Sequence, residues 1–396
     1  MIRAEEKANP AASPAAGSNM PGMAKSSSEA PVPGVFLMID SLQTGGSERQ
    51  FVALSRSLDQ KQFRVGLGCI QAKGGFLAGL NVDTFPLGGS LYGWRSWRTR
   101  MRLGRHLREQ RIDVAHAFDF YANLTLLPSA RLAGIPVVIG SQRQLGDLLT
   151  PMQSRAQMMM FRWCDAVVCN SSAAAHRLIE EGLPEDKINV IWNGLGPEAF
   201  AAAAPALPRR PGWLRVGMIA RMNSTSKNHS LLLRAAARLK DRVPNVEFVM
   251  VGDGPLRPPL EQQAASLGLG SRVQFLGDRR DIPAILASLD LTVLPSDSES
   301  LSNAVIESMA AGVPAIASRV GGNPELLTPE RGMLVPAGEE RGLAEAMLVL
   351  LQNDALRVQM GQNCRRFALE NFTIEQMRRK HEQLYTQLLE RKKSRS

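Results

Sequence analysis

Two glutamates, Glu299 and Glu307, stand eight positions apart in the stretch SDSESLSNAVIESMAAGVPAIAS. The pattern predicts that a strand ends at Ser296, that a loop follows, and that a helix begins with Ser302 or Asn303 as its N-cap. Glu307 then lies one turn after Asn303, among apolar residues that face a core. Its carboxylate therefore either lies on the exposed edge of the helix or has a functional role.

The loop and the first helical turn together offer groups that bind a phosphorylated sugar. One carboxylate can accept hydrogen bonds from a pair of sugar hydroxyls, and the other can do the same for a ribose. The free backbone N–H groups of Ser300, Leu301 and Ser302 can meet a phosphate. The alternative to a binding site is a structural role, in which one glutamate interacts favourably with the helix dipole and the other is simply exposed. The spacing of the whole set favours the binding site.

Two cations follow a predicted strand in the second half of the chain, in the stretch ARMNSTSKNHS. Arg221 ends the strand, and Lys227 stands at the entrance of the next helix. Cations at the carboxyl end of a parallel strand, in front of a helix N-terminus, can hold a diphosphate. The alternative is two solvated surface cations. Nearby, Gly252 and Gly254 form a strand-end turn that gives room for a ligand beside the cations.

A glycine pair, Gly45 and Gly46, separates the first predicted strand from a helix that begins at about Ser47, in the stretch SLQTGGSERQF. Glycines let the backbone approach a ligand, and the helix N-terminus offers N–H groups to an anion. The stretch lacks the full GxGxxG fingerprint, which disfavours a dinucleotide cofactor. A plain tight turn is the remaining alternative, and we expect no cofactor.

The composition is that of an ordinary folded protein. The 396-residue chain has 44% hydrophobic and 21% charged residues, and it has no run of 18 apolar residues. Four scattered cysteines match neither a disulfide framework nor a zinc spacing, and there is no apolar leader, so we expect a reduced cytoplasmic protein. The net charge of +10 favours acidic partners: nucleic acid, anionic lipid or phosphorylated small molecules.

The candidate residues need a scaffold that brings them together, and the hydrophobic pattern predicts one. Short apolar runs alternate with helical patterns, stop at an Ala/Pro-rich stretch, and start again. This rhythm predicts an α/β fold of two doubly wound parallel sheets facing across a cleft. We expect a disordered tail over residues 1–32, an N-terminal Rossmann-like domain over 33–196, a linker over 197–213, a C-terminal Rossmann-like domain over 214–371, and a C-terminal helix with a basic tail over 372–396.

Taken together, these motifs resemble those of glycosyltransferase family 4, the retaining nucleotide-sugar transferases with the two-domain GT-B fold. The resemblance runs from the first strand to the C-terminal helix, and the E-x7-E spacing in its sequence context is its most specific part. It implies that Glu299 positions the transferred sugar and that Glu307 holds the ribose hydroxyls. Arg221 and Lys227 fall on the family's diphosphate-binding pair. The loop TGGSER matches the glycine loop facing the donor phosphate and the acceptor, and the last helix crosses back to the N-terminal domain.

The strand end VAHAFDF departs from the family pattern. Many members carry a second histidine where this chain has Phe118, so His116 is either a group near the acceptor or a structural histidine. Asp119 is then a candidate polar group near the acceptor. Arg143, at the end of another predicted strand, is a third candidate for contact with the acceptor or a phosphate.

The resemblance implies transfer of a hexose from a nucleoside diphosphate sugar to a lipid-linked or glycan acceptor, with the anomeric configuration retained. Oriented cations and a helix N-terminus can stabilise the departing diphosphate without a metal. Rival hypotheses are another GT-B enzyme, such as a phosphorylase or an epimerase, and a non-catalytic sugar-nucleotide-binding protein. A nucleic-acid-binding protein is disfavoured, because aromatic residues make up only 5% of the chain and no motif for it is present.

The segment WRSWRTRMRLGRHLREQR, residues 94–111, holds seven arginines and one glutamate. Trp94, Trp97 and Met101 fall at helical spacing with arginines around them, which suits a peripheral helix on anionic lipid at the inner face of a membrane. The alternative is a helix that packs on the N-terminal sheet with a solvated basic face. The sequence leaves both open.

Overall fold

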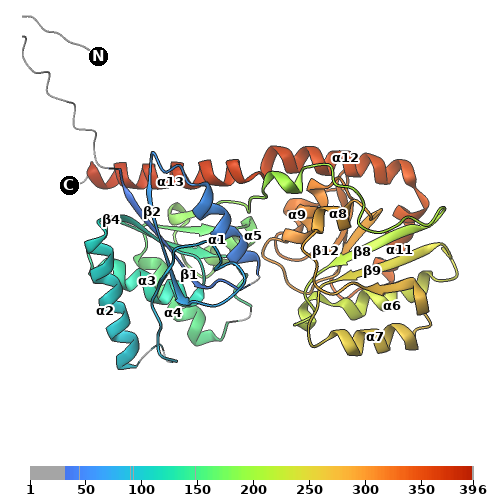
Figure 1. Ribbon diagram of the computed structural model, residues 1–396, viewed down its shortest axis with the longest axis horizontal. Helices are drawn as coiled ribbons and strands as arrows, with labels where there is room; N and C mark the ends of the chain where they lie inside the picture. The colour runs from blue at the N-terminus through green and yellow to red at the C-terminus, as the bar shows by residue number, and fades with distance from the viewer. Residues whose placement is uncertain (1–31, 44, 90, 92, 148, 395–396) are drawn as a thin grey trace, which may run out of the picture. The chain divides into compact units, whose positions relative to one another are not determined.

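Apolar residues fill the strands of two parallel sheets, as sheets covered by helices on both faces require. The computed structural model describes residues 32–394 except 44, 90, 92 and 148. Residues 33–396 form one unit that contains both sheets. We call the first sheet with its helices the N-terminal lobe and the second sheet with its helices the C-terminal lobe (Figure 1).

The sheet of the N-terminal lobe has the strand order β3-β2-β1-β4-β5-β6-β7. The order reverses between β1 and β4, the place where open parallel sheets bind ligands at their carboxyl edge. Its strands are β1 (Gly34–Ser41), β2 (Arg64–Gln71), β3 (Asp83–Thr84), β4 (Ile112–Ala117), β5 (Val137–Gln142), β6 (Ala166–Cys169) and β7 (Ile188–Val190).

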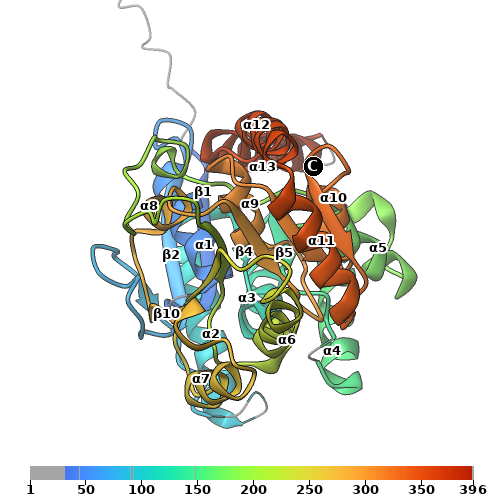
Figure 2. The same cartoon turned by 90° about the vertical axis from the view of Figure 1, so that its right-hand side faces the viewer.

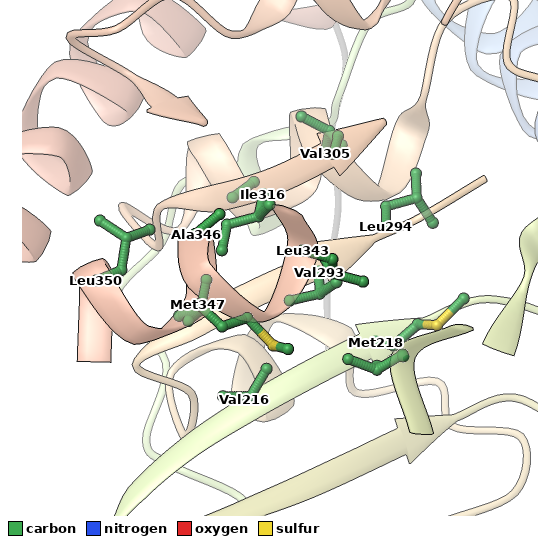
Figure 3. Close-up of a cluster of buried hydrophobic side chains, with 14 of the residues drawn as sticks. Val216, Met218, Val293, Leu294, Val305, Ile316, Leu343, Ala346, Met347 and Leu350 are labelled. Carbon is green, nitrogen blue, oxygen red and sulfur yellow. The ribbon is translucent and has the colours of Figure 1, made fainter. Parts of the chain in front are cut away.

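The sheet of the C-terminal lobe has the order β10-β9-β8-β11-β12-β13 and reverses between β8 and β11. Its strands are β8 (Leu214–Ile219), β9 (Val246–Val251), β10 (Val273–Phe275), β11 (Leu291–Leu294), β12 (Ala315–Ser318) and β13 (Gly332–Val335). Figure 3 shows how Leu343, Met347 and Leu350 lie against strand residues such as Val216 and Ile316 in the core of this lobe.

Helices follow most strands and cover the two faces of each sheet (Figure 2). In the N-terminal lobe they are α1 (Gly46–Ser57), α2 (Trp94–Glu109), α3 (Phe120–Leu132), α4 (Pro151–Trp163) and α5 (Ser172–Glu180). In the C-terminal lobe they are α6 (His229–Leu239), α7 (Arg257–Ser266), α8 (Ile282–Leu286), α9 (Asn303–Ala310), α10 (Asn323–Leu326), α11 (Glu340–Gln352) and α12 (Asp354–Asn371).

The last helix, α13 (Ile374–Lys393), belongs to the core of the N-terminal lobe although it follows α12. Its buried residues Met377, Tyr385 and Leu388 pack in one cluster with the apolar residues of β1, β4 and β5. The chain passes between the lobes at Phe372, whose carbonyl accepts a hydrogen bond from the N–H of Leu195. The predicted return of the C-terminal helix to the N-terminal lobe is confirmed.

The expected α/β architecture of two parallel sheets is confirmed, and the sheet of the N-terminal lobe ends in the short edge strand β3. The predicted disordered tail lies outside the described residues except at Val32. In the predicted linker, residues 200–213 have no helix or strand, and the domain limits at 196 and 214 stay predictions. None of the described helices is both long and apolar enough to cross a membrane.

Candidate donor and acceptor site

The loop that carries Glu299 is shaped by a glycine pair that sequence reasoning missed. A Cβ atom on Gly321 would lie 1.5 Å from the carbonyl oxygen of Glu299, and one on Gly322 would lie 2.2 Å from that of Ser300. Gly321 also has a positive φ of 48°, which favours glycine. The signal in the sequence was a Gly-Gly pair just after a buried strand, and it fixes the backbone of the E-x7-E loop.

The helix of the E-x7-E motif is α9, and it begins as the sequence predicted. Ser302 is its N-cap, with Oγ accepting a hydrogen bond of 3.3 Å from the N–H of Val305. Within the described chain, the N–H groups of Ser300, Leu301 and Ser302 donate to no protein acceptor. These three donors are therefore available to an anion near the helix N-terminus.

Glu299 is buried and paired with one of the two predicted cations. Its Oε1 accepts a hydrogen bond of 2.5 Å from Nζ of Lys227 and one of 2.8 Å from Oγ of Ser296. The loop of Lys227 is fixed by the next residue, because Nδ2 of Asn228 donates to Oδ1 of Asp297 over 3.0 Å. The structure thus brings together Glu299 and Lys227, which are 72 residues apart in the chain.

Arg221 lies just beyond the end of β8 and is exposed. The turn beside it contains the two predicted glycines, and the backbone of the preceding strand end comes close to both of them. A Cβ atom on Gly252 would lie 2.2 Å from the carbonyl oxygen of Ala220, and one on Gly254 would lie 2.4 Å from that of Met222. Both glycines have positive φ. They keep the ends of β8 and β9 together, and so they hold Arg221 in place.

Glu307 is buried in α9 and is bound by a residue of the other lobe. Nη1 of Arg49, near the start of α1, donates to Oε1 of Glu307. Burial raises the pKa of Glu307, and the charge and hydrogen bond of Arg49 oppose that rise. Arg49 was not predicted as a site residue, although it lies in the TGGSER loop. The only signal for it in the sequence was its place three residues after the glycine pair.

Side chains from the N-terminal lobe also meet the start of α9 and the loop before it. Oγ of Ser300 donates to Oδ1 of Asn170 over 2.6 Å, and Nδ2 of Asn193 donates to Oδ1 of Asn303 over 2.7 Å. The side chain of Ser300 is thus occupied by an interlobe contact, which leaves its N–H as the group that can bind a donor.

The predicted glycine loop lies beside α9, with Thr44 outside the described residues. A Cβ atom on Gly46 would lie 2.9 Å from Nδ2 of Asn303, and one on Gly45 would lie 2.1 Å from Oε2 of Glu48. The Glu48 carboxylate accepts a hydrogen bond from its own N–H, and burial raises its pKa. The N-terminus of α1 therefore already carries an anionic group, which was not predicted.

Acidic groups gather at the carboxyl edge of the N-terminal sheet. Asp40, at the end of β1, accepts hydrogen bonds from the N–H groups of Ala122 and Tyr121 over 2.6 and 3.2 Å. Burial and the neighbouring Asp119 carboxyl raise the pKa of Asp40 to about 8, and burial and Glu48 raise that of Asp119 to about 6. The predicted residue Asp119 is therefore in an acidic group with Asp40, which the sequence analysis did not single out.

Arg143 lies close to this acidic group, so the two predicted acceptor residues Asp119 and Arg143 are neighbours. Burial lowers the pKa of Arg143 to about 10, and the charges of Asp119 and Glu48 oppose this. Its Nη2 donates to Oδ1 of Asn193 over 2.6 Å, and its guanidinium carbon lies 5.4 Å from the ring centroid of Phe118. A polar acceptor bound here would meet both an acidic and a basic group.

His116 does not reach this surface, and its prediction as an acceptor group is corrected. The side chain is fully buried, with Nδ1 2.7 Å from the hydroxyl of Tyr385 and Nε2 2.8 Å from Oγ of Ser141. Burial lowers its pKa well below the usual range. Both ring nitrogens are occupied inside the lobe, so the structure supports the alternative, a structural histidine joining α13 to the sheet.

One exposed face of α2 carries both aromatic and basic side chains. The rings of Trp94 and Trp97 are stacked with centroids 4.7 Å apart, and their side chains are 70% and 52% exposed. Leu103 and Leu107 on the other face are buried in the core of the lobe. Exposed arginines lie along the same helix: Arg95, Arg98, Arg102, Arg105 and Arg108. The helix thus packs on its lobe, as one alternative predicted, with these aromatic and basic side chains exposed.

Two Rossmann-like lobes form the GT-B fold of glycosyltransferases, and the predicted donor residues Glu299, Glu307, Arg221 and Lys227 all lie in the C-terminal lobe. The sequence model of Glycosyltransferase Family 4 matches residues 44–199, and that of Glycosyl transferases group 1 matches residues 214–353. A phosphatidyl-myo-inositol mannosyltransferase of Mycobacterium leprae is 30% identical over 266 residues, which are 65% of this chain and 68% of that protein. The chain belongs to glycosyltransferase family 4.

Two further proteins show how far the similarity extends. The lipopolysaccharide core biosynthesis glycosyltransferase LpsE of Rhizobium meliloti is 30% identical over 233 residues, which are 59% of this chain and 65% of that protein. The crystal structure of Anabaena HepE in complex with UDP and glucose matches 89% of this chain and 99% of that chain, with a TM-score of 0.76 and 21% identity. At that identity the match shows the fold alone.

Proposed function

We propose that this glycosyltransferase moves a hexose from a nucleoside diphosphate sugar to an acceptor, with retention of the anomeric configuration, in polysaccharide or glycolipid biosynthesis. The observation that carries the proposal is the pairing of Glu299 with Lys227 beside the free N–H groups of Ser300 and Leu301. The carboxylate can accept hydrogen bonds from sugar hydroxyls, and the ammonium and the two N–H groups can donate to a diphosphate. The Anabaena HepE structure holds UDP and glucose, which supports a donor of this class.

The roles of the donor-side residues follow from their charge and position. Lys227 and Arg221 neutralise the diphosphate as it leaves, and the N–H groups of residues 300–302 add hydrogen bonds. Glu299 accepts hydrogen bonds from the sugar hydroxyls, and Glu307 accepts those of the ribose. These cations can perform the charge neutralisation that a metal performs elsewhere, so we propose a reaction that needs no metal and no cofactor.

The acceptor side is proposed at Asp119, Arg143 and Asp40, at the carboxyl edge of the N-terminal sheet. Carboxyls in a partly buried setting bind hydroxyl groups well. A lipid-linked or glycan acceptor, which is rich in hydroxyls, fits this chemistry. The similarity to a phosphatidyl-myo-inositol mannosyltransferase supports an acceptor that carries a lipid.

The first experiment is a thermal-shift panel with UDP, GDP, ADP and TDP on the wild-type protein and on Glu307→Ala. A ligand that binds only the folded state raises the melting temperature according to its occupancy. We expect one nucleotide to raise it in the wild type and not in the variant. No shift from any nucleotide would overturn the proposed donor site.

Two measurements on the active protein test the finer claims. Proton NMR of the product gives its anomeric configuration, and an inverted product would overturn retention. Activity after dialysis against EDTA tests whether the reaction needs a metal ion. An activity lost with EDTA and restored by a divalent cation would overturn the metal-independent reaction.

We also propose that the Trp94–Trp97 face of α2 contacts a membrane with anionic lipids. Stacked indoles suit the lipid interface and arginines suit its negative charge. Flotation with vesicles of phosphatidylglycerol and phosphatidylcholine should recover the protein, and vesicles of phosphatidylcholine alone should not. The double variant Trp94→Ala, Trp97→Ala should stay unbound. The control Leu132→Ala removes an apolar side chain that lies outside this face and is 77% exposed, and it should bind. Equal flotation of all variants would contradict the proposal.

A further inference from the structure

One guanidinium connects the glycine loop of the N-terminal lobe to the proposed ribose-binding carboxylate of the C-terminal lobe. Arg49 on α1 donates to Glu307 on α9, across 258 residues of sequence. The side chain of Glu307 is 11% exposed, and that of Arg49 is 49% exposed. Solvent therefore reaches the cation much more easily than the carboxylate that it binds.

Glu307 depends on Arg49 because, among the residues that the structure describes, only Arg49 stabilises its charge. Burial favours the neutral acid, and Arg49 alone opposes it by charge and by hydrogen bond. Within the described chain, no other side chain donates to the carboxylate of Glu307. Lys227 is paired with Glu299, and Arg365 of α12 donates to the carbonyl of Ala310 at the end of α9.

The geometry leaves acceptor capacity on Glu307 while Arg49 is bound. An ionised carboxylate has two oxygens and about four acceptor positions. Arg49 uses Oε1, so Oε2 and the remaining position on Oε1 can accept from two hydroxyls. Arg49 and a ribose are thus compatible partners of one carboxylate and need not compete.

We propose that Arg49 is a positioning residue for the donor, which orients the Glu307 carboxylate so that it accepts both ribose hydroxyls. The proposal rests on the proposed function, since it takes Glu307 to bind the ribose. It adds that Arg49 of the N-terminal lobe takes part in nucleotide binding through Glu307. Binding of the nucleotide then depends on a contact between the lobes.

The test measures nucleotide affinity by calorimetry as a function of pH. Wild type, Arg49→Ala and Arg49→Lys are titrated with whichever of UDP, GDP, ADP and TDP raises the melting temperature of the wild type. Arg56→Ala is the matched control, because it removes an exposed arginine from the last turn of the same helix. Melting of each variant without nucleotide establishes that it is folded.

We expect Arg49→Ala to weaken binding by about tenfold or more, as for the loss of a charge-assisted hydrogen bond. The loss should be larger near pH 6 than near pH 8, because Glu307 without Arg49 binds a proton more readily and the neutral acid is a weaker acceptor. Arg49→Lys should restore the weak pH dependence of the wild type with an intermediate affinity, since lysine keeps the charge but not the planar fork. Arg56→Ala should match the wild type.

A double variant separates positioning from a purely structural contact. If Arg49 acts through Glu307, Arg49→Ala adds little to the loss caused by Glu307→Gln. Additive losses, a loss equal at every pH, or wild-type affinity in Arg49→Ala would each overturn the inference while the donor site stands. Absence of binding by the wild type to all four nucleotides would instead overturn the proposed function.

Discussion

Lys227 and Glu299 form an ion pair at the proposed donor site, with Nζ of Lys227 2.5 Å from Oε1 of Glu299. One belongs to the turn before α6 and the other to the loop before α9, so each element contributes one charge to the same point. The side chain of Glu299 is 8% exposed, whereas that of Lys227 is 33% exposed. The ammonium can therefore face a diphosphate while it still neutralises the carboxylate beneath it.

Replacement of Lys227 by alanine should lower kcat by a factor of about 10² to 10³, the usual effect of removing one preorganised group that stabilises developing charge. The variant also leaves the Glu299 carboxylate without its cation, and the unpaired negative charge repels the phosphates. Steady-state kinetics with the donor identified by the thermal-shift panel measures the effect. Lys61→Ala removes an exposed lysine of the N-terminal lobe and serves as the control. A kcat equal to that of the wild type would remove Lys227 from the proposed mechanism.

Gly321→Ala should abolish most activity while Gly338→Ala keeps it. Both positions have positive φ, 48° and 75°, so both substitutions strain the backbone in the same sense. Only at Gly321 does the new Cβ meet the carbonyl of Glu299; at Gly338 nothing lies within 4 Å. Kinetics and melting temperature of the two variants separate the displaced Glu299 loop from the backbone strain. Equal activities would show that the position of this loop is not critical.

The parts of the site that the sequence predicted correctly are those set by local rules. The N-cap at Ser302 and the presence of the strands before Glu299 and Arg221 follow from residue types within a few positions. The strands β11 and β8 end at Leu294 and Ile219, each two residues earlier than predicted. The pattern of buried strands likewise predicted both parallel sheets. Their functional roles came from the resemblance to a family and stay predictions.

The parts that were missed depend on residues far apart in the chain. Arg49 and Asp40 look like ordinary polar residues in the sequence, and their partners come from other elements after folding. His116 shows the converse. Its position in the sequence suggested the acceptor site, but Tyr385 of α13 and Ser141 contact its two ring nitrogens inside the lobe. A single sequence shows which residues end a strand, but it does not show which side chains they meet.

Tyr385→Phe should destabilise the fold, because it leaves the buried Nδ1 of His116 without its partner. An unsatisfied buried polar group costs about 1–3 kcal/mol, so the free energy of unfolding should fall by that amount. The ring of Tyr385 also contacts that of Phe63, and phenylalanine keeps this contact. Urea unfolding measures the difference, with Tyr121→Phe at a 44% exposed position as the control. An unchanged free energy of unfolding would contradict the structural role of His116.

Asp40→Asn should stabilise the protein increasingly as the pH rises. The pKa of Asp40 is about 8 in the folded protein against an ordinary 3.8, because of burial and the charge of Asp119. Between these values the folded state holds a proton that the unfolded state has released, so stability falls as pH rises, with a slope of up to about 1.4 kcal/mol per pH unit. Asparagine is neutral at every pH and can still accept a hydrogen bond from the N–H of Ala122, so the variant escapes this loss.

The measurement is urea unfolding of the wild type and Asp40→Asn at several values between about pH 5 and pH 8. The free energy of unfolding of Asp40→Asn minus that of the wild type should increase steadily with pH over this range. The control Asp147→Asn, at an exposed position, should show the same pH dependence as the wild type. A constant difference between Asp40→Asn and the wild type would mean that Asp40 is already ionised at the lower pH. The acidic group would then carry its full negative charge at the proposed acceptor side, and Arg143 rather than a neutral acid would have to set which acceptor binds.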